Sequence, residues 1–450
     1  MTTNQNQTQG QNVLHLPGPD AATAVAAYTQ DPLAFLTRCA REYGEIVPIQ
    51  LDDTLFCLLT NPEHITQVLK DRQMFVKAED TRMLSTLVGN GLLISEGSFW
   101  LRQRRLTQPI FHQKRIESYS EVMVEYTQKM LENWKTGNVL DIHKEMMSLT
   151  LNIVMKTIFD QDLNDDDASN IAEALEHCMS WFVAKTTALL SENDNPIPED
   201  TSYQDAIKLL DKTIYATIER RREAGEIGND LLSMLMQVED ADDGSRMSDR
   251  QLRDEVSTLV LAGHETTANA LSWTWMLLGQ HPDVRTELDR ELQTVLQGRT
   301  PTLEDIRRLP YTTAIVQEAM RLYPPVTDLS RAATQDCDIG GYIMPKGTTL
   351  IVSQWVMHRH PRYFTQPEMF NPNRWADDFE KSLPRGVYFP FGDGPRVCIG
   401  RGFAMMEAVL LLATIAQSFQ LELAPNQAIE KQASVTLRPQ TGIQVILRGN

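Results

Sequence analysis

One cysteine of this 450-residue chain lies in a loop whose neighbours favour reactivity at the sulfur atom. Cys398 follows Phe391-Gly392-Asp393-Gly394-Pro395-Arg396 and precedes Gly400, and an apolar helix is expected from Phe403 onward. The glycines permit a tight turn whose backbone can approach another object closely. The helix that begins after Cys398 would direct unpaired N–H groups and its positive dipole end at the sulfur, which favours the thiolate. Such a lone thiolate suits a metal centre that brings its other ligands with it, as haem does.

A carboxyl group and a hydroxyl group stand side by side in the middle of a second segment. A long apolar helix is expected from about Ser248 to Gln280, and its centre reads Ala262-Gly263-His264-Glu265-Thr266-Thr267. Such polar residues conflict with the apolar helix around them, and conflicts of this kind often mark function. Because Thr266 lies four residues after Ala262, its hydroxyl can bond that carbonyl group and open the helix. An acid beside an alcohol can relay protons, although a solvated helix face is the alternative interpretation.

The cysteine loop resembles that of the cytochrome P450 family, whose pattern is Phe-x-x-Gly-x-Arg-x-Cys-x-Gly. Every fixed position of the pattern is filled, which leaves an inert buried cysteine as the less favoured alternative. The resemblance implies that Cys398 is the axial thiolate ligand of haem b, that Arg396 faces a haem propionate and that Phe391 shields the sulfur. Gly392 and Gly400 would let the backbone approach the haem.

The central helix resembles a motif of the same family. Ala262-Gly263-x-Glu265-Thr266-Thr267 is similar to the segment that activates oxygen. The resemblance implies that Ala262 lies over the haem, and that Thr266 and Glu265 are catalytic residues that deliver protons.

A third motif concerns structure rather than chemistry. Glu318 and Arg321 would share one face of a helix over Tyr311–Tyr323, and such a pair alone is typical of a solvated surface. It resembles the family's buried Glu–Arg pair, which an arginine from a downstream loop completes, here Arg374. That loop departs from the commoner form, with Asn373 where an acidic residue is frequent and Trp375 in place of Phe.

Three further residues are candidates for binding the haem propionates. Trp100 and Arg104 resemble the family's Trp-x-x-x-Arg helix beneath the haem, and Arg331 matches a frequent propionate arginine. The planar guanidinium group of arginine pairs well with carboxylates. A solvated basic helix face is the alternative interpretation.

Electrons for such an enzyme must come from separate proteins. The chain contains no flavin or nicotinamide fingerprint, and the family resemblance implies a ferredoxin or a flavodoxin with its reductase as electron donor. Five basic residues form a cluster that is a candidate docking patch for an acidic electron carrier. They are Arg102, Arg104, Arg105, Lys114 and Arg115.

Two other function classes compete with a monooxygenase. His264-Glu265 begins like the zinc motif HExxH, but Ala268 occupies the position of the second histidine. A non-enzymatic haem-thiolate sensor or electron carrier would have no use for the Glu265-Thr266 pair. We therefore expect a monooxygenase that inserts one oxygen atom from O2 into a C–H or double bond of a lipophilic molecule. A fatty acid, a terpenoid and a polyketide all remain open as its substrate.

The composition of the chain indicates which binding partners and which cellular compartment to expect. Sixty acidic and 42 basic residues give a net charge of −18, which disfavours nucleic acid and anionic membrane surfaces as partners. Five scattered cysteines form no zinc or disulfide pattern, which fits a reducing compartment. The longest apolar stretch, Phe403 to Ala416, carries Glu407 and is too short to anchor the chain in a membrane. A cytoplasmic protein is expected.

The elements that must position these residues are mostly helices. Residues 1–16 are expected to be a disordered polar tail and residues 17–450 a single catalytic domain. Helical spacing occurs over 120–134 and 205–222, whereas strand-like segments are few, and the acidic loop at 239–244 is expected to be solvated. The strand-like segments are 46–59, 338–353 and 433–447. The sequence thus predicts a mainly α-helical fold with small β-sheets. The family resemblance implies the cytochrome P450 fold, with haem between the long central helix and the cysteine helix.

Overall fold

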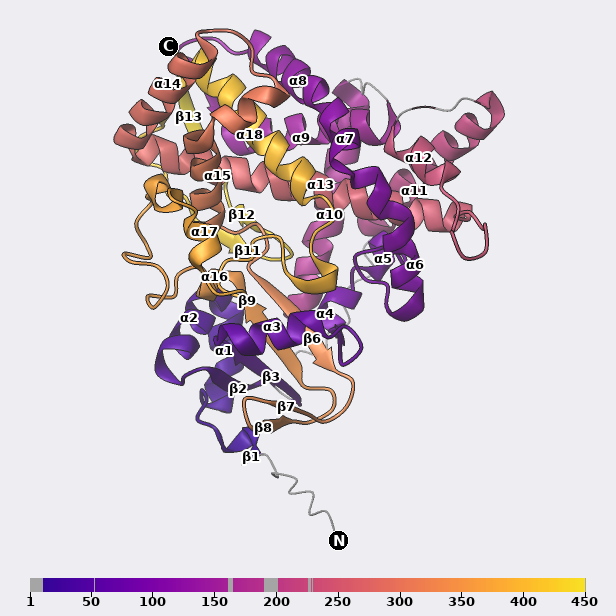
Figure 1. Cartoon of the computed structure of the whole chain (residues 1–450), viewed down its shortest axis with the longest axis vertical. Coiled ribbons are helices and arrows are strands. Elements are labelled where there is room, and N and C mark those ends of the chain that lie inside the picture. Colours follow the sequence, from indigo (N-terminus) through magenta and orange to yellow (C-terminus); the bar gives the residue numbers. More distant parts are fainter. Residues whose placement is uncertain are drawn as a thin grey trace.

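A long helix, α13 (Asp249–Gln280), passes through the middle of the computed structural model, which describes residues 11–51, 53–160, 165–189, 201–225, 228 and 230–449 (Figure 1). Ser248 caps the helix, because its hydroxyl accepts the Gln251 N–H while the Gln251 side chain accepts the Ser248 N–H. The helix ends before Pro282, as expected.

The middle of α13 differs from expectation in one respect. The Thr266 hydroxyl donates to the Ala262 carbonyl group at 2.6 Å, as its spacing predicts. The helix nevertheless continues without interruption from Asp249 to Gln280, so the expected opening at its centre is wrong. A hydroxyl group can share a carbonyl oxygen that already accepts a backbone N–H, because that oxygen has two lone pairs.

Helices surround α13 and bury nearly all of its faces. It packs against α9 (Ile142–Phe159), α15 (Pro310–Leu322) and α18 (Arg401–Ser418), and these elements share the larger hydrophobic core. The other α-helices of the described residues are α1 (Ala21–Gln30), α2 (Pro32–Glu42), α3 (Pro62–Lys70), α4 (Glu79–Arg82), α5 (Ser85–Val88), α6 (Gly97–Thr107), α7 (Gln113–Ile116), α8 (Ser120–Glu132), α10 (Asp165–Leu189), α11 (Thr201–Ala224), α12 (Leu231–Gln237), α14 (Pro282–Leu296), α16 (Gln354–Met357) and α17 (Phe379–Ser382).

The strands form small sheets, and the largest lies with α1, α2 and α3 at the end of the molecule near the N-terminus (Figure 1). Its strand order is β2-β3-β9-β6-β4, and a second hydrophobic core packs against it. The strands are β1 (Gln11–Asn12), β2 (Ile46–Leu51), β3 (Thr54–Leu59), β4 (Phe75–Lys77), β5 (Val139–Asp141), β6 (Asp328–Ala333), β7 (Cys337–Ile339), β8 (Tyr342–Met344), β9 (Thr349–Ser353), β10 (Phe419–Leu423), β11 (Lys431–Ala433), β12 (Leu437–Pro439) and β13 (Gln444–Gly449). The predicted class, mainly helical with small sheets, is confirmed.

Two expectations, one about the N-terminal tail and one about the acidic loop, need correction. Residues 11–16 were expected in the disordered tail, but β1 pairs in parallel with β8 and Val13 is fully buried in the turn that follows. Residues 1–10 of that tail lie outside the described residues. The acidic loop between α12 and α13 was expected to be solvated, but Asp240 is buried, because Arg102 and Arg105 both pair with it.

Candidate functional site

A cavity of about 300 Å³ lies between α13 and the loop that carries Cys398. All of the residues that the sequence predicts for the site line this cavity, with the exception of Glu265. They are Trp100, Arg104, Ala262, Thr266, Arg331, Phe391, Gly392, Arg396, Cys398 and Gly400. The chain positions of these residues span three hundred residues, so only the fold brings them to one place.

The cysteine loop is a tight turn that needs its glycines. Gly392 and Gly394 have φ angles of +71° and +72°, which favour glycine. A Cβ atom on Gly394 would also lie 2.2 Å from the Leu69 carbonyl oxygen of α3. The Cys398 N–H closes the turn by donating to the Phe391 carbonyl group at 2.9 Å.

The sulfur of Cys398 faces the cavity at the beginning of α18. The side chain is accessible from the cavity but lies deep within the protein, and this burial raises the pKa of the thiol. The backbone N–H groups of Gly400 and Arg401 bond to the sulfur and act in the opposite direction on its pKa. The expected arrangement of a helix N-terminus directed at the sulfur is therefore present.

Basic side chains gather along one edge of the cavity. Arg396 stacks over the Trp100 ring at 4.4 Å and bonds to the Ser95 carbonyl group and the Glu96 carboxylate. Its Nε and Nη1 atoms are buried and have no partner among the described residues. Arg104 donates to the Val397 carbonyl group at 3.0 Å, and burial lowers the pKa of its guanidinium.

Lys77 joins this edge, although no sequence pattern indicated it. It lies on β4 directly opposite Arg331 on β6, and both side chains are buried and line the cavity. Burial lowers the pKa of Arg331 to about 10 and that of Lys77 well below its usual value, and the nearby guanidinium groups add to the effect. Like charges opposite each other in a sheet destabilise it, so this edge of the cavity is suited to an anion.

The acid and the alcohol of α13 point in different directions. Thr266 lines the cavity together with Ala262. Glu265 is buried elsewhere and accepts a hydrogen bond from the Thr436 hydroxyl at 2.6 Å. Burial raises the pKa of Glu265, and its bond to Thr436 opposes that rise. Neighbouring positions on a helix face different sides, so the structure does not bring both side chains to the cavity.

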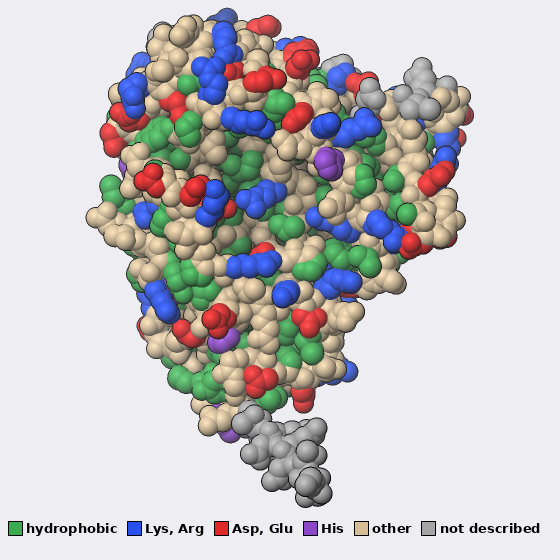
Figure 2. Space-filling view, viewed as in Figure 1, with side chains coloured by type: hydrophobic (Ala, Val, Ile, Leu, Met, Phe, Trp, Pro, Cys, Tyr) green, Lys and Arg blue, Asp and Glu red, His purple; other side chains and the backbone are tan. Residues whose placement is uncertain are grey.

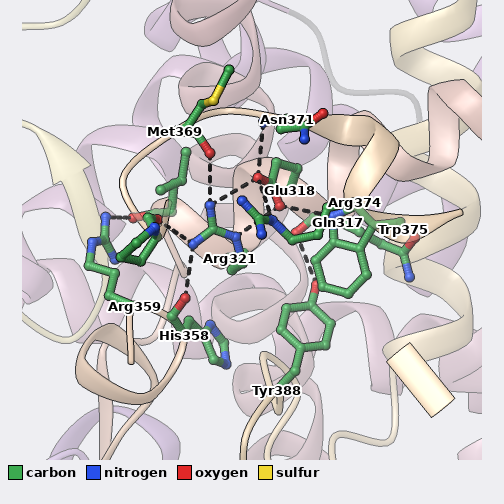
Figure 3. A network of polar contacts seen from close by, with 12 residues as sticks. Gln317, Glu318, Arg321, His358, Arg359, Met369, Asn371, Arg374, Trp375 and Tyr388 are labelled. Atoms are coloured by element: carbon green, nitrogen blue, oxygen red, sulfur yellow. Dashed lines mark hydrogen bonds and ion pairs between the residues drawn. The ribbon is translucent and has the colours of Figure 1, made fainter. Parts of the chain in front are cut away.

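The predicted Glu318–Arg321 pair is fully buried at the centre of a polar network (Figure 3). Arg321 also donates to backbone carbonyl groups of the downstream loop, and Arg374 Nε reaches Glu318 at 3.3 Å. Trp375, the residue that departs from the family pattern, donates its indole N–H to Glu318 at 2.9 Å. The departure therefore adds a partner to the buried carboxylate.

These residues fit haem b. One cysteine sulfur faces the cavity. The unpaired N–H groups of Arg396 and three further basic side chains line one edge, where carboxylate groups would satisfy them. The remaining wall is largely apolar, as a porphyrin ring requires. Within the described ranges there is no cluster of three His, Cys, Asp or Glu residues that could hold a metal ion. His264, the first residue of the segment that resembles HExxH, does not line the cavity, and its Nε2 atom lies 3.1 Å from the Met147 carbonyl oxygen.

The model of the cytochrome P450 family matches residues 22–447 of this chain. Cyclooctatin synthase of Streptomyces melanosporofaciens is 34% identical over 416 residues, which are 90% of this chain and 89% of the relative. Pentalenene oxygenase of Streptomyces avermitilis is 30% identical over 413 residues, 90% of each chain. The crystal structure of the cytochrome P450DA heme domain has a TM-score of 0.87 at 28% identity and covers 96% of this chain and 97% of that domain. The chain therefore belongs to the cytochrome P450 family: it is a haem b-dependent monooxygenase that takes electrons from redox partners and inserts oxygen from O2 into a lipophilic substrate.

Proposed function

We propose that Cys398 is the proximal haem ligand and that Thr266 and Glu265 deliver protons on the opposite side of the cavity. The observation that carries this assignment is the position of the Cys398 sulfur, which faces the cavity at the N-terminus of α18. Haem b bound to a thiolate activates O2 with two electrons and two protons and inserts one oxygen atom into a C–H bond. The protein must supply a charged sulfur, a fixed haem position and a route for the protons.

Each residue has a task that follows from its position. The N–H groups of Gly400 and Arg401 stabilise negative charge on the sulfur, while Phe391 and Gly392 form the wall beside it. The Thr266 hydroxyl can turn from the Ala262 carbonyl group and hold a proton toward the cavity. Glu265 would have to leave Thr436 to serve Thr266, because its carboxyl group faces away from the cavity.

The basic edge of the cavity, formed by Lys77, Arg104, Arg331 and Arg396, is called the propionate edge below, and its charges support this assignment. Lys77, Arg104, Arg331 and Arg396 bring four basic side chains to this edge, and the carboxylates of Glu96 and Asp80 lie near Lys77 and Arg331. Basic side chains outnumber carboxylates at this edge, so the two propionates of haem b would find partners there. Carboxylates at this edge would also stabilise the ammonium form of Lys77, which burial alone disfavours.

Replacement of Cys398 tests this central assignment. Cys398→Ser should abolish the red-shifted carbon monoxide band of the reduced haem protein, because that band requires a thiolate ligand. Cys337→Ser, at a cysteine outside the cavity wall, should leave the band unchanged. A red-shifted band that persists in Cys398→Ser would exclude Cys398 as the ligand.

For the substrate we propose a neutral terpenoid. All charged residues of the cavity wall belong to the cysteine loop or the propionate edge; they are Lys77, Arg104, Arg331, Asp393 and Arg396. The rest of the wall is mostly apolar and includes Leu92, Val154, Ile158, Leu259 and Val326. Its polar side chains are uncharged, so among the described residues it offers no cation to pair with a fatty-acid carboxylate. A buried carboxylate without a partner is strongly unfavourable. Several relatives bear the names of terpenoid oxygenases, cyclooctat-9-en-7-ol 5-monooxygenase among them.

The spin state of the haem iron reports which ligand fits this wall. A cyclic diterpene alcohol and a fatty acid of equal carbon number should be compared by titration of the holoprotein. We expect the terpenoid to shift the spin state at a concentration at least about tenfold lower, which corresponds to about 1.4 kcal/mol. Tighter binding of the fatty acid would contradict the proposed substrate class.

The electron donor is proposed to be a ferredoxin or a flavodoxin that docks beside the cysteine loop. The docking patch expected from sequence needs correction, because Arg104 faces the cavity while Arg102 and Arg105 pair with Asp240 and Asp242. Lys114, Arg115 and Lys70 remain exposed, and basic side chains are spread across this face (Figure 2).

These three residues, which we call the basic rim, flank the cysteine loop. A Cβ atom on Gly402 of α18 would lie 2.9 Å from Ile116, the neighbour of Arg115, and Gly394 lies against Leu69, the neighbour of Lys70. An acidic carrier bound at the basic rim would therefore stand close to Cys398.

We also propose that residues 17–450, with β1 and Val13 packed against them, act as one catalytic domain in the cytoplasm. The family model extends over nearly all of that range. All five cysteines are free, which fits a reducing compartment. Within the described residues, no helix is long and apolar enough to cross a membrane.

A further inference from the structure

Two adjacent carboxyl groups near the beginning of α13 bind the backbone of a loop far earlier in the chain. Asp254 and Glu255 lie on the second turn of α13, and both side chains are buried. Asp254 Oδ2 accepts the Asn90 N–H at 2.9 Å, and Glu255 Oε2 accepts the Leu92 N–H at 3.1 Å. These residues belong to the loop between α5 and α6. Hydrogen bonds from backbone N–H groups to carboxylates are strong, so the main chain of the loop is held at two points.

The loop lies directly on α13, and its glycines permit this close approach. A Cβ atom on Gly91 would collide with Thr258 Oγ1 and would lie 2.6 Å from the Asp254 carbonyl oxygen. Gly89 has a φ angle of +56°, and a Cβ atom there would collide with the Asp254 carboxylate. The backbone of the loop is therefore fitted to this surface of the helix in a way that only glycine allows.

The same loop forms part of the cavity wall. Leu92 and Leu93 line the cavity, and so do Thr258 and Leu259 on the next turn of α13. Because the backbone is fixed at Asn90 and Leu92, the side chains of the two leucines have a defined place over the cavity. The two carboxyl groups that fix it lie outside the wall.

Each carboxyl group has a second partner on a helix. Glu255 Oε1 accepts Gln103 Nε2 of α6 at 2.9 Å. Asp254 Oδ1 accepts Arg253 Nη1 at 3.1 Å, and Arg253 also pairs with Asp211 of α11. One oxygen of each group thus bonds to the loop and the other to a helix. The loop is tied through this network to α6, α11 and α13 together.

We propose that Asp254 and Glu255 are positioning residues for substrate selection: they hold residues 89–92 so that Leu92 and Leu93 favour ligands bulky enough to reach them. A wall that is already in place costs a ligand less ordering than a mobile wall does, so affinity rises for any ligand that contacts it. A ligand too small to reach the leucines gains nothing. This role depends on the proposed haem site, and it assigns selectivity to groups outside the cavity wall.

Two ligands of haem iron test the role of Glu255 in the holoprotein. Imidazole is small, whereas 4-phenylimidazole extends into the cavity, and shifts of the Soret band give both dissociation constants. Glu255→Ala removes the acceptor of the Leu92 N–H, so we expect the preference for 4-phenylimidazole over imidazole to fall at least about threefold. Glu255→Gln should keep most of the preference. Its amide oxygen can accept the Leu92 N–H while the Gln103 amide turns to accept the new NH2 group.

Glu291→Ala is the matched control. Glu291 on α14 also accepts backbone N–H groups, that of Tyr311 at 2.7 Å and that of Thr312 at 2.8 Å, but none of these residues lines the cavity. Both alanine variants should unfold at lower urea concentrations than the parent, and only Glu255→Ala should change the ligand preference. An unchanged or higher preference in Glu255→Ala, or an equal fall in Glu291→Ala, overturns the proposal.

A second variant covers the case in which Glu255→Ala fails to load haem. Gly91→Ala leaves both carboxyl groups in place, but its methyl group would collide with Thr258 and displace the loop, so the preference should fall in the same way. The carbon monoxide band separates this role from the assignment of Cys398. An unchanged preference in a variant that keeps the red-shifted band rejects only the role of Asp254 and Glu255.

Discussion

Thr266 and Glu265 are neighbours in the chain, yet only Thr266 meets the cavity. Its hydroxyl group donates to Ala262 at 2.6 Å, which leaves its oxygen free to accept a proton donor from the cavity side. The Glu265 carboxyl group is held by Thr436. At the scale of single residues, therefore, the alcohol is in place and the acid must move.

Thr266→Ala should uncouple the enzyme, because the hydroxyl group that directs a proton into the cavity is lost. We expect reductant to be consumed at a similar rate while product per electron falls about tenfold and peroxide accumulates. Thr266→Ser keeps the hydroxyl group and should restore most of the coupling. Equal coupling in the parent and Thr266→Ala would remove Thr266 from the mechanism.

Glu318 shows how one residue organises an element. Its carboxylate joins α15 to the loop before the cysteine through Arg374, Trp375 and the Asn371 N–H. This loop precedes the segment that carries Phe391. Because a buried ion pair is tolerated only when further hydrogen bonds satisfy it, the added indole partner favours retention of the pair.

Glu318→Ala should prevent stable haem incorporation, because it leaves the Arg321 guanidinium buried without its counter-charge. The expected loss of stability is about 3–5 kcal/mol. Trp375→Phe removes one donor and should lower the free energy of unfolding by only about 1–2 kcal/mol, with normal haem content. Haem content and urea unfolding measure both effects. A fully loaded but inactive Glu318→Ala would contradict the structural role.

Neutral histidines join α9 to α13, the two helices beside the cavity. His143 Nδ1 lies 3.2 Å from the Ser272 hydroxyl, and His264 Nε2 lies 3.1 Å from the Met147 carbonyl oxygen. Burial lowers the pKa of both histidines to about 4. Asp141 raises and Arg438 lowers the pKa of His143, but burial dominates.

This interface should weaken in acid. The unfolded chain takes up protons on histidine below about pH 6.5, whereas the folded protein excludes them until about pH 4. The stabilisation is thus complete above pH 6.5 and is lost as the pH falls toward 4, by up to about 3 kcal/mol per histidine. Buried Glu255, whose pKa burial raises to about 7, changes stability in the opposite sense.

A histidine variant isolates this contribution. In urea unfolding at pH 7 and pH 5, His143→Gln should lose less stability on acidification than the parent, because glutamine does not titrate. Identical differences between the two pH values in both proteins would mean that His143 does not contribute.

At the scale of the whole molecule, a net charge of −18 coexists with a face that carries exposed basic groups. The basic rim at Lys70, Lys114 and Arg115 lies where the helices α3 and α7 approach the cysteine loop. Overall charge therefore repels acidic carriers from most of the surface and leaves this region to attract them.

Lys114→Glu with Arg115→Glu should slow reduction by an acidic ferredoxin about tenfold at low salt, because electrostatic attraction steers the encounter. The difference should shrink near 0.5 M salt, where charges are screened beyond a few ångströms. Lys346→Glu, in the exposed turn between β8 and β9, is the control and should have little effect. Equal rates at low salt for the parent and the double variant would place the docking surface elsewhere.

Local signals in the sequence were sufficient for the helical class, the extent of α13 from about Ser248 and the loop around Cys398, because helix periodicity, turns and ligand spacing are encoded by nearby residues. Tertiary structure alone decided which distant groups meet. It placed Lys77 opposite Arg331, buried Asp240 against Arg102 and Arg105, and turned Glu265 toward Thr436. Spacing along the chain determines which way a side chain can face on its own element. Its partners, its charge state and therefore its chemistry depend on elements hundreds of residues away.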